Sequence, residues 1–102
     1  MHMTEYQFNA GEYRLNSATL QYALLGLSGE VGELHSYIAK LIRDGGAADQ
    51  EHIKKELGDI LWFVAAIASD YGLTLEEVAR GNIQKLSSRK ERGTLQGSGD
   101  NR

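Results

Sequence analysis

Two pairs of acidic residues are the feature of this sequence with the clearest chemical potential. Glu30 and Glu33 form one pair, Glu56 and Asp59 form the other, and each pair is spaced i, i+3. On a helix this spacing places both carboxylates of a pair on one face. Hard divalent cations such as Mg²⁺ take oxygen ligands, above all from carboxylates. The spacing therefore predicts a metal site made of four acids.

The neighbours of these acids favour a metal over simple solvation. An exposed acid on a helix usually has a Lys or Arg one turn away, as Glu51 does. Among the four acids only Asp59 has such a neighbour, Lys55. Two like charges 4 Å apart repel by about 4 kcal/mol at an effective dielectric near 20. We therefore expect a cation from outside the helices; the alternative is four solvated acids at helix edges.

Apolar periodicity predicts four helices that would carry these acids. They are expected over residues 5–13, 18–43, 50–71 and 74–92. Along the second and third, apolar residues recur in steps of three and four, and each acid pair follows the same edge of its stripe. The expected N-caps are Thr4, then Asn16 or Ser17, then Asp49, and Thr74 in a capping box with Glu77.

The short connection between the second and third helices determines how the acid pairs meet. Residues 44–49 allow only an antiparallel hairpin. One pair lies about 12 residues before the connection and the other about 8 after it, which gives an axial offset of about 6 Å. We therefore expect the carboxylates to converge on one site that takes Mg²⁺, with Mn²⁺ as a substitute.

The fourth expected helix carries a complementary basic face. This face contains Asn82, Lys85, Arg89 and Arg92. Lys and Arg suit phosphate oxygens, and Asn can donate to or accept from a sugar or base. The alternative is an ordinary basic helix C-terminus, which the helix dipole favours. Together with the acid pairs, this face predicts a polyphosphate substrate.

Three more residues are candidate substrate contacts. Trp62 lies on the Asp59 side of its helix, where it would either stack a base or be buried at a subunit interface. Ser98 and Arg102 belong to a tail rich in Gly and Ser, residues 93–102. We expect this tail either to fold over bound phosphates or to be disordered.

Length and composition limit the classes of protein to consider. The 102 residues suit a single domain, with an N-terminal arm over 1–16, a helical core over 17–92 and the tail. A net charge of −3 argues against binding a nucleic-acid polymer. No apolar run is long enough for a membrane span, and no secretory signal is visible. The absence of cysteine fits a cytoplasmic protein.

The expected fold class is all-α: an antiparallel helical hairpin with additional helices. Such a hairpin has more apolar surface than a chain of this size covers alone. Apolar residues outside the main stripes, such as Leu25 and Phe63, point to further packing. We therefore expect self-association into a homodimer or a dimer-of-dimers tetramer with an oligomeric four-helix-type bundle.

Three segments resemble the MazG-like nucleotide pyrophosphohydrolases. They are Gly29 to Leu34, Lys55 to Ile60 and Asn82 to Leu86, and the resemblance extends from about Leu24 to the C-terminus. It implies an all-α, Mg²⁺-dependent enzyme that cleaves nucleoside triphosphates, often deoxynucleotides, to the monophosphate and pyrophosphate. The expected role is cleansing of the nucleotide pool.

The resemblance also implies roles for individual residues. Glu30, Glu33, Glu56 and Asp59 would carry the metals, and Asn82 and Lys85 would help to bind substrate. We expect Glu33 and Glu56 to be catalytic, Glu33 as the group that takes the proton of the attacking water. A dUTP or dCTP hydrolase and a phosphoribosyl-ATP pyrophosphatase remain open within this class. The alternative outside it is a non-catalytic helical module that binds a metal or a partner.

Overall fold

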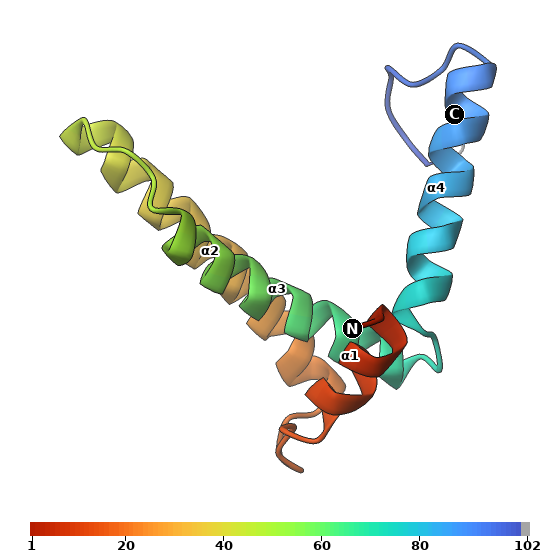
Figure 1. The fold of residues 1–102 in the computed structure, drawn as a ribbon, viewed down its shortest axis with the longest axis horizontal. Helices are drawn as coiled ribbons and strands as arrows, with labels where there is room; N and C mark the ends of the chain where they lie inside the picture. Colours follow the sequence, from red (N-terminus) through yellow and green to blue (C-terminus); the bar gives the residue numbers. More distant parts are fainter. Residues whose placement is uncertain (101–102) are drawn as a thin grey trace.

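A computed structural model describes residues 1–100 and places them in four helices (Figure 1). These are α1 (Met3–Gly11), α2 (Leu20–Asp44), α3 (Gln50–Asp70) and α4 (Leu75–Glu91). No strand occurs within residues 1–100, so the predicted all-α class is confirmed. In this part of the chain no helix combines the length and the apolar character that crossing a membrane requires.

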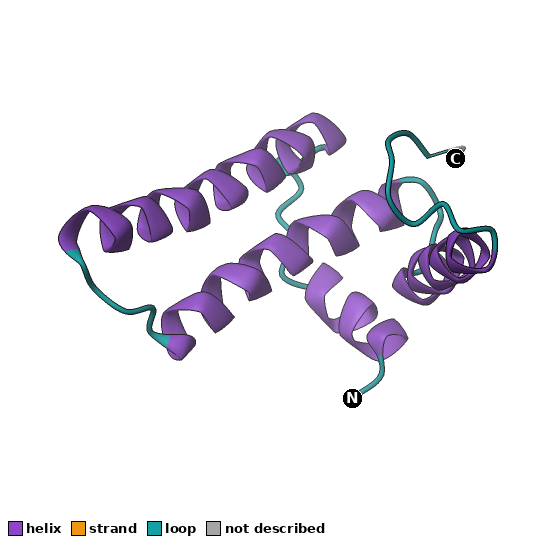
Figure 2. Cartoon of the chain, turned by 90° about the horizontal axis from the view of Figure 1, so that it is seen from above, coloured by secondary structure: helices purple, strands orange, loops and turns teal. Residues whose placement is uncertain are grey.

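Helices α2 and α3 form the expected antiparallel hairpin, which is seen along its length in Figure 2. Helix α2 ends at Gly45, whose φ of 73° lies in the left-handed region that glycine adopts without strain. Helix α3 begins after Asp49, whose side chain accepts a hydrogen bond from the Glu51 amide. Both caps are local signals, which explains why the sequence located this turn correctly.

The N-caps of the other helices agree with the sequence in part. Thr74 and Glu77 form the predicted capping box of α4. The predictions for the first two helices were wrong. Thr19 caps α2 in place of Asn16 or Ser17. The N-cap of α1 is His2 in place of Thr4, and the His2 side chain makes no cap hydrogen bond. Thr19 is the residue in extended conformation whose hydroxyl oxygen reaches the Tyr22 amide.

Small residues on α2 allow α3 to approach closely. Ala23 is buried, and a methyl group on Gly26 would collide with the Phe63 ring. The Phe63 ring also packs edge-on against Trp62, with ring centroids 5.1 Å apart. This contact lies near the end of the hairpin remote from its turn. It holds the two helices in the register that the acid pairs share.

Helix α1 covers the C-terminal part of α3, at this same end of the hairpin, and packs at the corner with α4. Ala65, Ala68 and Leu75 form the buried core there, with Tyr6 packed against them. The Gln7 side chain donates to the Ser69 hydroxyl and the Leu73 carbonyl and accepts from the Leu75 amide. These three hydrogen bonds are 2.8 to 2.9 Å long. Arg14 adds a two-bond ion pair with Asp70, each bond 2.9 Å.

From this corner α4 projects away from the hairpin, so the chain has an open V shape (Figure 1). Within the described residues, α4 packs on α1 and α3 but not on α2. The radius of gyration is 16.4 Å, whereas a compact chain of this length has about 13 Å. The accessible surface is 7744 Å², against about 5,700 Å² for a compact monomer of this mass. Much apolar surface therefore stays uncovered in one chain.

Candidate functional site

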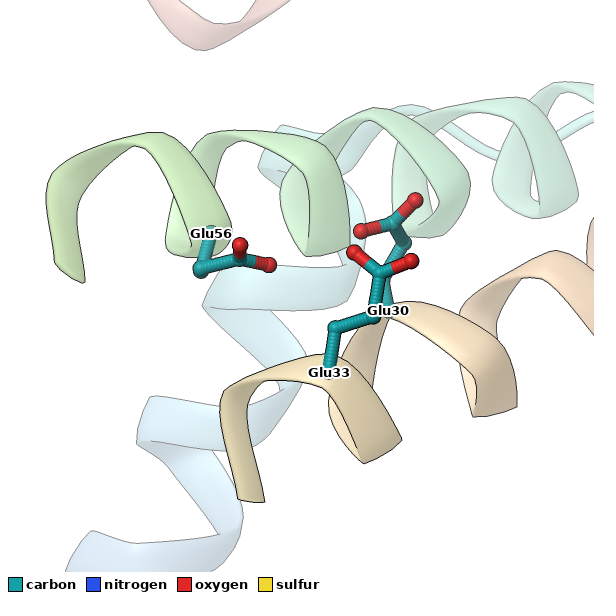
Figure 3. A group of neighbouring side chains, drawn as sticks. All are labelled: Glu30, Glu33 and Glu56. Carbon is teal, nitrogen blue, oxygen red and sulfur yellow. The ribbon is translucent and has the colours of Figure 1, made fainter. Parts of the chain in front are cut away.

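Three of the four predicted acids come together between α2 and α3. Glu30 and Glu33 from α2 and Glu56 from α3 each place an oxygen within 4.8 Å of the others. Figure 3 shows the three carboxylates directed into the space between the two helices. The predicted convergence of the two acid pairs is confirmed for these three residues.

The spacing of the three oxygens suits one divalent cation. Mg²⁺ binds oxygens at about 2.0–2.1 Å, so two oxygens on opposite sides of the ion lie about 4.2 Å apart. The observed limit of 4.8 Å exceeds this by a few tenths of an ångström. Adjacent oxygens on an octahedral ion lie only about 2.9 Å apart, so the carboxylates would draw closer together on binding. All donors are carboxylate oxygens, which matches Mg²⁺ or Mn²⁺ rather than a softer metal.

Burial makes this cluster costly without a cation. Glu30 Oε2 and Glu56 Oε2 are buried and have no hydrogen-bond partner within the described residues. Burial raises the pKa of the Glu30 carboxyl, and the charges of Glu33 and Asp59 raise it further. Each like-charged pair at 4.8 Å costs about 3 kcal/mol at an effective dielectric near 20, and less where a carboxylate reaches solvent. The residues present therefore fit a bound cation.

Asp59, the fourth predicted ligand, is exposed and lies outside the group of three. Its charge still acts on its surroundings. It contributes to the raised pKa of Glu30, and together with burial it raises the pKa of the Tyr6 hydroxyl. Asp59 therefore acts on the cluster electrostatically without being one of its three members.

No lysine or arginine compensates the cluster in the part of the chain that the structure describes. The ion pairs of those side chains all involve other acids. The one partner is His52, whose Nε2 lies 3.4 Å from Glu56 Oε1. An open groove of about 540 Å³ leads to Glu33 and Glu56, and Tyr37, Lys40 and His52 also line it. The cluster is therefore accessible from solvent.

The residues of the predicted basic face lie on α4, which does not pack on α2 and is away from the cluster. Lys85 Nζ pairs with Asp100 Oδ1 at 3.1 Å. Arg89, only 4% exposed, donates to the carbonyls of Gly99 and Asp100. The tail thus folds back on α4 and places a carboxylate on two of the predicted phosphate-binding cations.

The other predicted contacts have separate surroundings. Asn82 is exposed beside an apolar groove between α1 and α4. Arg92 donates to the Ser88 hydroxyl, and Ser98 is exposed in the tail. Arg102 lies outside the described residues. The structure brings none of Asn82, Arg92 and Ser98 to the carboxylate cluster of the same chain.

Trp62 faces α1 rather than the acid cluster. Its indole N–H donates to the Ala10 carbonyl at 3.0 Å. The ring borders a cavity of about 200 Å³ between α1 and α3, beside Gln7 and Arg14. Its position supports a packing role between these helices, and stacking on a substrate base stays a prediction.

His52 is the site residue that sequence reasoning missed. It precedes Glu56 by four residues, so a search for cationic neighbours that included histidine would have found it. Its ring stacks on Tyr37, with centroids 3.8 Å apart and planes 11° from parallel. This pairing between helices has no signal in the sequence.

Comparison with known proteins identifies the family of this chain. A family model described as the MazG nucleotide pyrophosphohydrolase domain matches residues 18–94. The chain belongs to the MazG nucleotide pyrophosphohydrolase family. The matched region contains all four acids and the basic face of α4. The resemblance inferred from the three short motifs is confirmed.

One relative of this MazG-family chain is the Gene 37 protein of Mycobacterium phage L5. The two are 39% identical over 114 residues, and the alignment covers 100% of each chain. No solved structure gives a significant match. MazG-family proteins generally depend on divalent metal ions, and in this member the carboxylate cluster is the group of residues that fits one.

Proposed function

We propose that the protein is a Mg²⁺-dependent pyrophosphohydrolase that cleaves nucleoside triphosphates, including deoxynucleotides, to the monophosphate and pyrophosphate. The observation that carries this proposal is the cluster of Glu30, Glu33 and Glu56, two of whose buried oxygens lack a partner. Family membership supplies the reaction class. Cleansing of the nucleotide pool in the cytoplasm is the role we assign to this activity.

Glu30, Glu33 and Glu56 would hold the cation, and Asp59, whose charge acts on Glu30, is assigned as a further ligand of the same or a second ion. When bound, Mg²⁺ lowers the pKa of a coordinated water and neutralises charge on phosphate oxygens. Mn²⁺ would substitute because it also accepts carboxylate ligands. The proposal takes its support from oxygens that the fold leaves buried and uncompensated.

Glu33 is suited to take the proton of the attacking water. It is the exposed member of the cluster and lines the groove through which substrate would enter. Glu56 lines the same groove, but one of its oxygens is buried and the other faces His52. We therefore assign proton transfer to Glu33, and to Glu56 the role of a negatively charged metal ligand.

Phosphate binding is assigned to the basic face of α4, with Asn82, Lys85, Arg89 and Arg92 as its members. Ser98, Arg102 and Trp62 are retained as weaker candidates. Because α4 does not pack on α2 in one chain, this face and the cluster stay apart there. A second copy that packs on the exposed hairpin would bring its own α4 toward the cluster. The uncovered surface supports such a homodimer or dimer-of-dimers tetramer.

Pyrophosphate release from a panel of nucleotides tests the proposal. The panel contains the common ribo- and deoxynucleoside triphosphates, with dUTP and dCTP, and phosphoribosyl-ATP. We expect release with Mg²⁺ or Mn²⁺ and none with excess chelator. A non-catalytic metal-binding module would bind the ion without releasing pyrophosphate from any substrate.

A further inference from the structure

The two carboxylate oxygens of Glu56 have different surroundings. Oε1 lies 3.4 Å from His52 Nε2, whereas Oε2 is buried in the cluster without a hydrogen-bond partner. A free glutamate side chain has several rotamers, and fixing one of them costs conformational entropy. Repulsion from Glu30 and Glu33 would favour the rotamers that leave the cluster. A neutral histidine ring can carry its N–H at Nε2, and such a contact on Oε1 opposes that departure. Oε2 is then the oxygen left without a hydrogen-bond partner.

His52 is itself held from the neighbouring helix. Its ring stacks on the Tyr37 ring at a centroid distance of 3.8 Å. The Tyr37 hydroxyl accepts a hydrogen bond of 2.9 Å from the backbone N–H of Asp49. Asp49 is also the N-cap of α3. The α3 N-terminus, the tyrosine and the histidine thus form a continuous series of contacts that ends on Glu56.

We infer that His52, clamped by Tyr37, is a positioning residue that turns Glu56 Oε2 toward the cation. The inference rests on the function proposed above, because it assigns a role in building that same metal site. Mutation of a group that contacts and orients a metal ligand typically lowers metal affinity or activity by about 10- to 100-fold. His52 and Tyr37 line the open groove beside Glu56, so the contact is reachable by solvent and does not serve only to fill a core.

Metal binding without nucleotide is the direct test. The full-length protein is titrated with MnCl₂ in a calorimeter at fixed pH and ionic strength. The set of proteins is wild type, His52→Phe, His52→Gln and Tyr37→Leu. Phe keeps the ring stack and removes the nitrogen, whereas Gln keeps a donor near the position of Nε2 and removes the stack. Leu at position 37 leaves His52 intact but removes its clamp.

We expect His52→Phe to weaken Mn²⁺ binding about ten-fold. Tyr37→Leu should also weaken Mn²⁺ binding, but by a smaller factor. His52→Gln should recover part of the affinity. His35→Phe on the exposed surface of α2 is the matched control and should bind as wild type does. Excess Mn²⁺ should restore pyrophosphate release by His52→Phe, because the defect is in ion retention and not in proton transfer.

Two results separate this inference from the proposed function. Wild-type affinity in both His52→Phe and Tyr37→Leu, with Mn²⁺ binding lost in Glu56→Gln, would overturn the positioning role and leave the metal site in place. Absence of Mn²⁺ binding by the wild-type protein would overturn the metal site itself. Thermal unfolding of each variant, followed by circular dichroism, shows whether the fold is retained. If His52→Phe fails to fold, the Tyr37→Leu titration decides.

Discussion

The α2–α3 hairpin and α4 differ in whether their charged side chains have partners of opposite charge. Between α2 and α3, three carboxylates converge and two of their oxygens are buried without a partner. On α4 and the tail, charges pair within the chain: Lys85 and Arg89 with Asp100, and Arg80 with Glu76. The contrast separates charges that are paired within the chain from a cluster that the proposed cation would neutralise.

Uncompensated burial is the more informative of the two arrangements. An exposed ion pair contributes little to stability, and a helix surface often contains several. A cluster of like charges in which two oxygens are buried and unpaired costs free energy in every molecule that lacks a cation. Such a cost in free energy indicates function. The variants below compare substitutions in the cluster with substitutions on α4.

The largest effect is expected from Glu56→Gln in the cluster. The change keeps the shape of the side chain and removes one negative ligand, so pyrophosphate release should fall by about 10²-fold or more. Glu76→Gln on α4 is the matched control, because that acid is exposed and already paired with Arg80. Near-normal turnover by Glu56→Gln would remove the cluster from the mechanism.

A smaller effect is expected from Lys85→Met on α4. Loss of one phosphate-binding charge should raise KM about ten-fold and change kcat less, because ground-state and transition-state binding weaken together. Asp100→Asn provides the opposite change, since it frees Lys85 from its partner in the tail, and it should leave KM unchanged or lower it. An unchanged KM in Lys85→Met would mean that α4 does not bind phosphate.

The raised pKa of Glu30 predicts how stability depends on pH in the metal-free protein. Because the pKa is higher in the folded state, the contribution of Glu30 is fully present below the ordinary pKa of glutamate. It is lost as pH rises through the raised value. The free energy of unfolding should therefore fall across that window, and Mg²⁺ should restore it at neutral pH.

Denaturant unfolding with and without Mg²⁺ measures this dependence. Glu30→Gln should flatten the slope of the metal-free protein in that window. Asp70 acts in the opposite sense at lower pH, because its hydrogen bond with Arg14 lowers the pKa of that carboxyl. The difference between wild type and Glu30→Gln removes this second contribution. Equal slopes for the two proteins would contradict the electrostatic account of the cluster.

The smallest effect is expected from Arg80→Ala. It breaks an exposed ion pair of 2.7 Å with Glu76, one turn away on the same helix. Such pairs contribute about 0.3–0.5 kcal/mol, so chemical denaturation should detect little change and pyrophosphate release none. A large loss of activity would show that exposed charges on α4 matter beyond the predicted face.

The sequence predicted what depends on local chemistry and helix geometry. The caps at Asp49 and Thr74 are short-range hydrogen bonds, and the convergence of Glu30 with Glu56 follows from helix rise and the length of one turn. The start of α1 was misplaced because its cap has no side-chain bond to signal it. The start of α2 was also misplaced, because Asn16 and Ser17 are N-cap residue types as suitable as Thr19, which caps the helix.

What the sequence did not predict depends on packing between distant segments. The direction of α4 is fixed by the contacts of Gln7 with residues more than 60 positions away, and no periodicity encodes them. The stack of Tyr37 on His52 likewise joins two helices. Asp59 was expected to bind the metal with the other three acids, but it lies outside their group, and helix periodicity alone did not predict this.

Crystallography with Mn²⁺ is the most direct test of the central claim that the hairpin carboxylates hold a cation. The account predicts an anomalous peak between α2 and α3, about 2.0–2.3 Å from oxygens of Glu30, Glu33 and Glu56. Crystals saturated with Mn²⁺ that show no peak there, with those oxygens turned apart into solvent, would contradict it.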